Sequence, residues 1–562
     1  MNFYCFRYKF SNEKLKRTSL NLPKFIGTGI LMIFFFGSGC GRGQTSSKKV
    51  FNLNLETSLT SLDPAFARNQ FTLWCDNMLF NGLTQLNDSL KVIPCLAKSW
   101  SISPDGKTYI FALRRDIYFH PSSLFAHPNG RKVNAEDFIY SFYRLIDPKV
   151  ASSGSWIFTD KVNGKSSFLA LNDSTFEIIL KKPFPPLLKL LTAQYCSVVP
   201  KEVVEYYGKD FRNHPIGTGP FRLSYWKEDE FCVLLKNNHY FEMEKGVRLP
   251  YLDAIKISFI RDKQTAFLEF LKKNLDFFNN IDGSYRDDVL TKTGQLQDKY
   301  RGVFQMVSGP NLDTEYLGIL VDSSKALVKT SPLRIKKIRQ AINYAIDRKK
   351  IVKFLQNNMG TPGTSGFIPS GMPGFDPVSV KGYDYNPQKA QELILEAGFS
   401  NTNPLPILTL YTTVTYRDLI EYIQGELEDV GIHSSIIVSQ ATSLREQISK
   451  SRIGFFRGSW TADYPDGENY LSLFYSHNRV PFGPNYTGYV NAKFDKLFEA
   501  SYFETRDSTR FKLYQEMDRL VMEDAPVVVL YYANFINLRQ NNISGMGINA
   551  LNILSLKRTI KK

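Results

Sequence analysis

The chain has 562 residues, of which 43% are hydrophobic and 22% are charged, a balance typical of a globular protein with roughly two to four domains. Its net charge of +16 comes from scattered Lys and Arg residues, and no dense basic run or nucleic-acid motif argues for DNA or RNA binding. None of the six cysteines forms a C-x-x-C pair, so neither a zinc site nor a thioredoxin-like site is predicted.

The first forty residues have the pattern of an export signal. A basic stretch precedes the apolar run FIGTGILMIFFF at 25–36, which is followed by small residues and Cys40. This order is typical of a secretory signal, and the run is too short for a membrane-spanning helix. The cysteine resembles that of a bacterial lipobox, although a glycine replaces the usual aliphatic residue. We therefore predict a lipoprotein-type signal over 1–39, lipidation of Cys40 and a tether over 40–49; the alternative is an ordinary signal peptide followed by an unmodified cysteine.

Strand-like runs and amphipathic helices are mixed over the rest of the chain, which predicts a mixed α/β fold. The chain contains no second long apolar run. The four cysteines after Cys40 could form disulfides in an exported protein, and the sequence leaves this open. The expected strands are 51–55, 109–113, 175–180, 231–235, 255–260, 407–411, 435–439 and 527–532.

Four helices can be placed by their end signals. Ser331 before Pro332 is expected to cap one helix, and Asn386 before Pro387 is expected to cap another, which Gly398 ends. A third apolar stripe, over 419–430, stops at a glycine, and Asp507 is expected to cap the fourth helix. Two turns are also predicted, at 103–106 and at 217–220.

No catalytic constellation is found in the sequence. There is no G-x-S-x-G elbow, H-E-x-x-H motif or Walker loop, and the six histidines are dispersed. The carboxylates Asp463 and Asp466 are close in sequence but have no nucleophile or metal motif beside them. We therefore predict a protein that is not an enzyme and that needs no cofactor or metal.

A series of motifs resembles one known family over residues 50 to about 535. The chain is similar to the family 5 solute-binding proteins, the peptide-binding and dipeptide-binding components of ABC importers. The blocks that carry the resemblance are LDPA at 62–65, PCLAKSWSISPDGKTYIFALRRDIYFH at 94–120, NAEDF at 134–138, IGTGPF at 216–221, IRQAINYAIDR at 338–348, YNPQKAQELILEAGF at 385–399, WTADYPD at 460–466 and DAPVVVLYY at 524–532.

The resemblance implies an α/β, two-lobed periplasmic-binding-protein fold with a hinge and an extra inserted domain, of the class II, cluster C type. Lobe I is expected to be discontinuous, and lobe II is expected over 311–524. The inserted small domain is expected over 96–211. The segments expected to form lobe I are 50–95, 212–310 and 525–562.

The resemblance also implies a binding site in the cleft between the lobes. In peptide-binding members the aspartate of the W-x-x-D block holds the ligand's ammonium, and here that residue is Asp463. A carboxylate suits this role because a buried ammonium needs a charged partner. Trp460 is expected to flank the ligand, and Arg457 to meet its carboxylate. The remaining candidates are Tyr464, Asn69 and Gln70; Arg68 stands where an acidic residue can occur in oligopeptide binders.

These expectations describe an extracytoplasmic, lipid-anchored monomer that captures short peptides and delivers them to the permease and ATPase subunits of an ABC importer. One alternative keeps the fold and changes the ligand to a nickel chelate, haem or a sugar. Another is a peptide-sensing or chaperone-like binding protein without a transporter.

Overall fold

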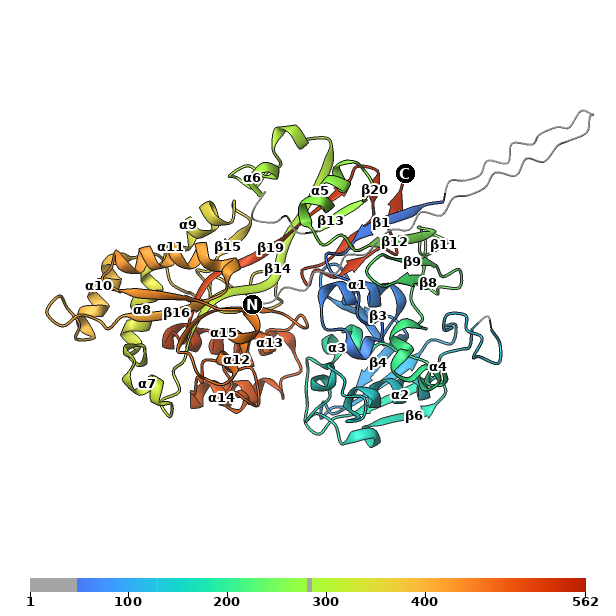
Figure 1. Ribbon diagram of the computed structural model, residues 1–562. Helices are drawn as coiled ribbons and strands as arrows, with labels where there is room; N and C mark the ends of the chain where they lie inside the picture. The colour runs from blue at the N-terminus through green and yellow to red at the C-terminus, as the bar shows by residue number, and fades with distance from the viewer. Residues whose placement is uncertain (1–47, 129, 280, 282–285) are drawn as a thin grey trace, which may run out of the picture. The chain divides into compact units, whose positions relative to one another are not determined.

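The computed structural model describes residues 48–128, 130–279, 281 and 286–562 (Figure 1). The predicted signal, Cys40 and most of the predicted tether lie outside these residues. Within the described residues, strands form three sheets of at least four strands each, together with four two-stranded ribbons. None of the helices in this part of the chain has the length and apolarity needed to cross a bilayer.

The first sheet has the strand order β1-β12-β9-β8. β1 runs parallel to β12, and the other neighbours are antiparallel. Alternate residues of β1 are buried, as expected for a strand with one face on the core. The strands are β1 (Val50–Asn54), β8 (Phe221–Lys227), β9 (Phe231–Lys236) and β12 (Ala254–Ser258).

The second sheet is antiparallel, with the order β4-β5-β7-β6. The turn predicted at 103–106 joins β4 and β5, and Gly106 has the left-handed φ of +68° that this turn requires. Phe138 and Phe142 of helix α2, which spans Ala135–Ile146, pack on Phe176 of β7. The strands are β4 (Ala97–Ile102), β5 (Thr108–Leu113), β6 (Phe168–Asn172) and β7 (Thr175–Ile179).

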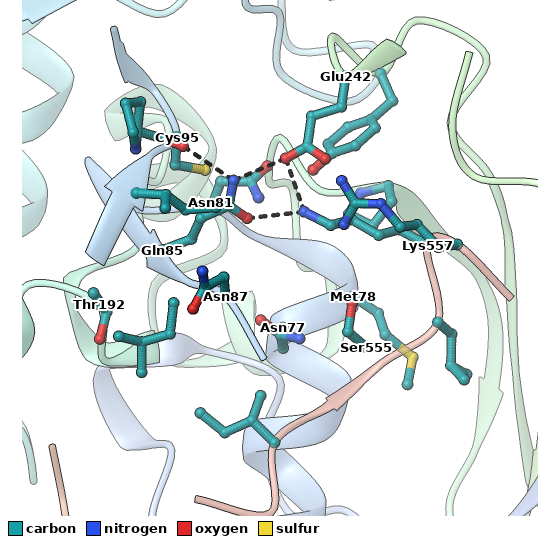
Figure 2. A pocket seen from close by; sticks show the side chains of 18 of the residues that line it. Asn77, Met78, Asn81, Gln85, Asn87, Cys95, Thr192, Glu242, Ser555 and Lys557 are labelled. Carbon is teal, nitrogen blue, oxygen red and sulfur yellow. Dashed lines mark hydrogen bonds and ion pairs between the residues drawn. The ribbon is translucent and has the colours of Figure 1, made fainter. Parts of the chain in front are cut away.

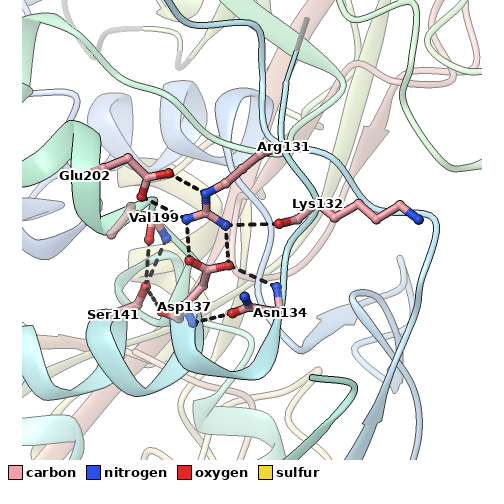
Figure 3. Close-up of polar contacts among 7 residues, drawn as sticks. All are labelled: Arg131, Lys132, Asn134, Asp137, Ser141, Val199 and Glu202. Carbon is pink, nitrogen blue, oxygen red and sulfur yellow. Dashed lines mark hydrogen bonds and ion pairs between the residues drawn. The ribbon is translucent and has the colours of Figure 1, made fainter. Parts of the chain in front are cut away.

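The NAEDF motif caps α2 (Ala135–Ile146) (Figure 3). Asn134 Oδ1 accepts from the Asp137 backbone N–H at 3.2 Å, and Asp137 Oδ2 accepts from the Asn134 backbone N–H at 2.9 Å. Arg131 donates to both oxygens of Asp137 and also pairs with Glu202 of α4 (Lys201–Tyr207). The motif therefore stabilises the start of this helix.

The third sheet has the order β13-β19-β14-β18-β16-β17, and β15 pairs with β19. Its two longest strands, β14 and β19, are antiparallel neighbours whose register shifts between Pro310 and Thr314. The strands are β13 (Phe277–Asn279), β14 (Phe304–Ile319), β15 (Gly360–Pro362), β16 (Leu408–Thr412), β17 (Ser434–Val438), β18 (Phe455–Thr461) and β19 (Val527–Gln540).

All eight predicted strands occur, with shifts of one or two residues at most ends. The four helices predicted from end signals also occur, two of them with corrections described below. The longer helices are α1 (Gln70–Leu79), α2, α4 (Lys201–Tyr207), α5 (Lys263–Leu271), α8 (Lys336–Ala345), α10 (Pro387–Glu396), α11 (Arg417–Glu428), α12 (Ala441–Ser449), α14 (Ala492–Ser501) and α15 (Asp507–Asp524).

Two predicted helix caps are wrong. Ser331 caps only a short 3-10 turn, because Ile335 is extended and the α-helix begins anew at Lys336. Asp507 is the first residue of α15 and not its cap; the cap position is Arg506, and Asp507 accepts from Arg510 at 2.6 Å. An acidic residue in the first turn still favours the helix by its charge. Asn386 caps α10 as predicted.

The four described cysteines are buried free thiols. Because they are buried, they act as small apolar residues of the core. They are Cys75, Cys95, Cys196 and Cys232.

The turn predicted at 217–220 lies against the end of α1. A Cβ at Gly219 would stand 2.4 Å from the Met78 carbonyl oxygen and 2.4 Å from the Leu79 carbonyl carbon. His120 spans the turn: its Nε2 lies 3.0 Å from the Gly219 carbonyl oxygen, and burial lowers its pKa to about 4, so it is neutral. Position 219 therefore requires glycine, because the backbone of the turn packs directly against the backbone at the end of α1.

We expect Gly219→Ala to lower the free energy of unfolding by about 2 kcal/mol, because the new methyl group forces the turn away from α1. Gly425→Ala is the matched control: that glycine lies within α11 with open space around its Cβ position, so alanine should be neutral or stabilising. Urea titration measures both. A Gly219→Ala variant as stable as the parent would show that the turn does not pack closely against α1.

Candidate functional site

Among the described residues, one edge of β18 has no partner strand over most of its length. β18 pairs with β14 over its whole length, from Phe455 to Thr461, but its other neighbour, β16, reaches only Phe456. Among the described strands, the stretch from Arg457 to Thr461 is therefore open on the side away from β14. An open edge offers backbone N–H and C=O groups to an extended ligand, so this edge is the candidate binding site.

The predicted site residues Arg457 and Trp460 do not lie together. They are three positions apart on one strand, so their side chains point to opposite faces of the sheet. Trp460 packs against the cluster that contains Tyr316 and Phe456, whereas Arg457 lies opposite Leu317. The two residues therefore belong to different parts of the candidate site.

Asp463 and Trp460 are joined by Asn469 of α13 (Glu468–Leu471). Asn469 Oδ1 accepts from Trp460 Nε1 at 3.0 Å and from the Asp463 backbone N–H at 3.3 Å, and its amide nitrogen lies 3.4 Å from Asp463 Oδ2. The Asp463 side chain reaches solvent. Desolvation by the surrounding protein nevertheless raises its pKa, and the Asn469 amide partly opposes this. The Asn469 amide thus positions the Asp463 carboxylate, and a cationic partner would stabilise its ionised form.

Because the Asn469 amide stabilises the ionised form, we expect Asn469→Ala to raise the pKa of Asp463 further. Selective ¹³C labelling of aspartate and an NMR titration measure this pKa. Ser472→Ala is the control, since its hydroxyl bonds to the Asn469 carbonyl and not to Asp463. An unchanged Asp463 pKa in Asn469→Ala would show that the amide does not hold the carboxylate.

The residues after Asp463 fasten this loop to other elements. Tyr464 is buried, donates to Glu468 and stacks on Trp156 with ring centroids 6.3 Å apart. Asp466 is completely buried and accepts from Lys189 Nζ at 2.7 Å and from the Tyr514 hydroxyl at 2.8 Å. Tyr464 therefore helps to position the loop, and its assignment as a ligand contact stays a prediction.

Arg457 forms a buried ion pair with Glu315 of β14. Its guanidinium also lies over the Tyr416 ring, 3.2 Å from the ring centroid. Burial raises the pKa of Glu315 to about 8, and Arg457 only partly opposes this. Burial likewise raises the pKa of the neighbouring Asp313. Arg457 Nε has no hydrogen-bond partner among the described residues.

A cavity of about 750 Å³ is lined by Glu315 and Tyr416, the two residues that contact Arg457. Gln70 lines it and donates to the Asn552 carbonyl at 2.6 Å. Asn69 is not among the lining residues; it caps α1 by accepting from the Thr72 backbone N–H at 3.0 Å. Polar residues from four separate segments line the cavity: Gln70, Asn311, Asp313, Glu315, Tyr416 and Asn552.

The sequence did not predict Asn469, Glu315 or Tyr416 as site residues. Asn469 follows Asp463 by six positions, and a search for amides near the W-x-x-D block would have found it. Glu315 and Tyr416 carry no local signal, because their contacts with Arg457 depend on strand register and helix packing.

The chain matches a family model, curated relatives and solved structures of solute-binding proteins. The model of the bacterial extracellular solute-binding proteins, family 5 (middle region), matches residues 91–482. The dipeptide-binding protein DppE of Bacillus subtilis is 26% identical over 546 residues, which is 92% of each chain.

Two solved structures share the fold. HbpA2 from Haemophilus parasuis aligns with a TM-score of 0.77 at 21% identity, covering 91% of this chain and 100% of that one. DppA from Helicobacter pylori, solved in complex with the peptide STSA, aligns with a TM-score of 0.73 at 22% identity, covering 91% and 98%. The predicted periplasmic-binding-protein fold is thereby confirmed.

Proposed function

Because the chain belongs to the bacterial extracellular solute-binding proteins of family 5, and so to a family of binding proteins and not of enzymes, we propose that it captures short peptides. The observation that carries this proposal is the open edge of β18, which ends two residues before Asp463. Peptides of any sequence share a backbone and an ammonium. An unpaired strand edge suits the backbone, and a held carboxylate suits the ammonium.

The other end of the ligand is proposed to meet Arg457. Arg457 and Asp463 are six positions apart, roughly 20 Å of extended chain. The guanidinium side chain shortens this span, so a peptide of roughly four residues fits. Where Glu315 is ionised, Arg457 already has a carboxylate partner, so its attraction for a ligand carboxylate is then weaker than that of Asp463 for an ammonium. Trp460 supplies an apolar wall, and Gln70 lines the cavity at the Arg457 end.

The cellular setting is also proposed. The chain works outside the cytoplasm as a monomer, anchored through lipidated Cys40, and delivers its ligand to the permease and ATPase of an ABC importer. Closure of lobe II, residues 311–524, on the discontinuous lobe I would bury the ligand and strengthen the Asp463 pair. A lipid anchor would keep the binding protein near its transporter.

Peptide binding should depend on pH through Glu315. A ligand carboxylate at Arg457 adds negative charge beside Glu315, whose pKa is about 8, and so favours its protonated form. Binding then takes up a proton, and affinity falls as pH rises between about 7 and 9, by up to roughly tenfold per pH unit. Calorimetry should show this slope for peptides with a free carboxyl end. Amidated peptides and Glu315→Gln should lack it; an equal slope for amidated peptides would contradict the role of Arg457.

The ligand class can be tested directly. The chain carrying Cys40→Ser is purified, the co-purifying ligand is identified by mass spectrometry, and di- to hexapeptides are titrated by calorimetry. We expect bound peptides in the mass spectrum and the tightest binding near four residues. A nickel chelate, haem or sugar recovered in stoichiometric amount, with no heat from any peptide, would refute the proposal.

A further inference from the structure

A second cavity, of about 770 Å³, lies apart from the edge of β18. Its walls come from α1, the β2–β3 hairpin, segment 240–244 and the C-terminal segment 549–558, with β2 spanning Thr84–Leu86 and β3 spanning Val92–Pro94 (Figure 2). None of the described residues between 311 and 524 lines it. It shares no lining residue with the cavity beside Glu315 and Tyr416, although Asn552 of the same C-terminal segment lines that other cavity.

The cations of this wall are paired with carboxylates, whereas Asp88, which also lines the cavity, has no ion pair with the described residues. Lys557 Nζ lies 2.8 Å from Glu242 Oε1 and 2.8 Å from Gln85 Oε1, as the dashed lines of Figure 2 show. Each described cation of the wall has a carboxylate partner, so an anionic ligand would have to break an existing pair. The pairs are Lys557–Glu242, Arg558–Glu244 and Arg114–Asp116.

Uncharged donors remain available. The side-chain carbonyl of Asn549 accepts from the backbone N–H groups of Leu551 and Ile553. That of Asn87 likewise accepts from two backbone N–H groups of its own turn. In both residues the amide NH₂ has no partner among the described residues. The cavity therefore presents neutral hydrogen-bond donors.

The Tyr240 hydroxyl is the strongest sign of a missing partner. Tyr240 lines the cavity and is 1% exposed, and its hydroxyl makes no hydrogen bond with the described residues. The side chains of Asn81 and Glu242 come close enough to shift its pKa as weak hydrogen-bond partners, but neither has the geometry of a formed hydrogen bond. A buried hydroxyl without a partner is costly, and a bound hydroxyl group would satisfy it.

We propose that this cavity is a second binding site, for a neutral polyhydroxylated ligand of mono- to disaccharide size. Hydroxyl groups both donate and accept, so they suit free amides and an unpartnered phenol. A neutral ligand leaves the ion pairs intact, and the volume lies in the range of small-molecule sites. Phe241 adds an apolar surface for a ring face. This proposal does not depend on the nature of the ligand at β18.

The first test uses D-glucose, N-acetyl-D-glucosamine and maltose as probes on the chain carrying Cys40→Ser. Calorimetry and saturation-transfer NMR measure binding, and glucose 6-phosphate and glucosamine serve as charged counterparts. We expect at least one neutral sugar to bind with a Kd in the millimolar range or below, and its charged counterpart to bind about tenfold or more weakly. Failure of all three sugars, or equal binding of the charged forms, would overturn the proposal.

Two variants that keep side-chain volume locate the site. Tyr240→Phe removes only the unpartnered hydroxyl, so sugar affinity should fall about tenfold while stability is kept. Asn81→Asp replaces an NH₂ donor by a charged acceptor but can still accept from Thr218, and it should abolish binding. Asp463→Asn should leave sugar affinity unchanged. Sugar binding that is insensitive to both cavity variants would place the sugar elsewhere and refute the assignment.

Discussion

Asp463→Asn should weaken the binding of peptides with a free amino end roughly 100-fold, a loss of about 3 kcal/mol. The variant keeps the shape of the side chain and its proximity to Asn469, so only the charge is lost. N-acetylated peptides have no ammonium and should bind the parent and the variant equally weakly. Calorimetry on the four combinations gives the coupling energy between Asp463 and the ligand ammonium.

Ser459→Ala is the control for this experiment. Ser459 is exposed on the open edge of β18, and the substitution keeps its backbone groups. Because the edge is proposed to act through backbone hydrogen bonds, this variant should bind peptides normally. A coupling energy near zero for Asp463, with affinity lost equally for free and acetylated peptides, would show that Asp463 only shapes the loop.

Asp466→Asn should produce the largest loss of stability, about 3–5 kcal/mol. Although burial favours the neutral acid, Lys189 and Arg510 hold the pKa of Asp466 below its ordinary value. Removing the carboxylate leaves two buried cations without this partner. Urea titration measures the loss, and the added substitution Lys189→Met should recover part of it.

The effect of Asp466 should also depend on pH. A lowered aspartate pKa contributes stability above the ordinary value, and this contribution is lost as pH falls through the lowered value. The parent and Asp466→Asn should therefore converge in strong acid. Glu446→Ala, which breaks an exposed helical pair with Lys450, is the control and should change stability little. A similarly small change for Asp466→Asn at neutral pH would show that the pairs of Asp466 with Lys189 and Arg510 do not stabilise the fold.

The sequence predicted elements well where several local signals coincide. α10 has a capping Asn386, a proline at its first position and Gly398 with a φ of +90° after its end. The helix predicted from Ser331 also had a cap and a following proline, but it had no glycine after its end, and the extended Ile335 divides it. Its apolar residues are buried on both sides of the break, so burial alone did not reveal the break.

The candidate site was predictable only in part. A motif identifies Arg457, Trp460 and Asp463 by their spacing, but it does not show that Arg457 and Trp460 face opposite sides of a strand. Glu315 meets Arg457 across 142 positions of sequence, through the pairing of β14 with β18. Such a contact follows from tertiary register, and no local pattern encodes it. The lobe boundaries and Cys40 lipidation stay predictions.

Hydrogen exchange along β18 tests most directly whether an extended peptide pairs with this strand. Bound tetrapeptide should slow exchange at alternate backbone amides between Arg457 and Thr461, namely those that point away from β14. Amides around the cavity of Asn81 and Tyr240 should keep their rates. A peptide that binds tightly, yet slows exchange only outside 457–461, would contradict the account.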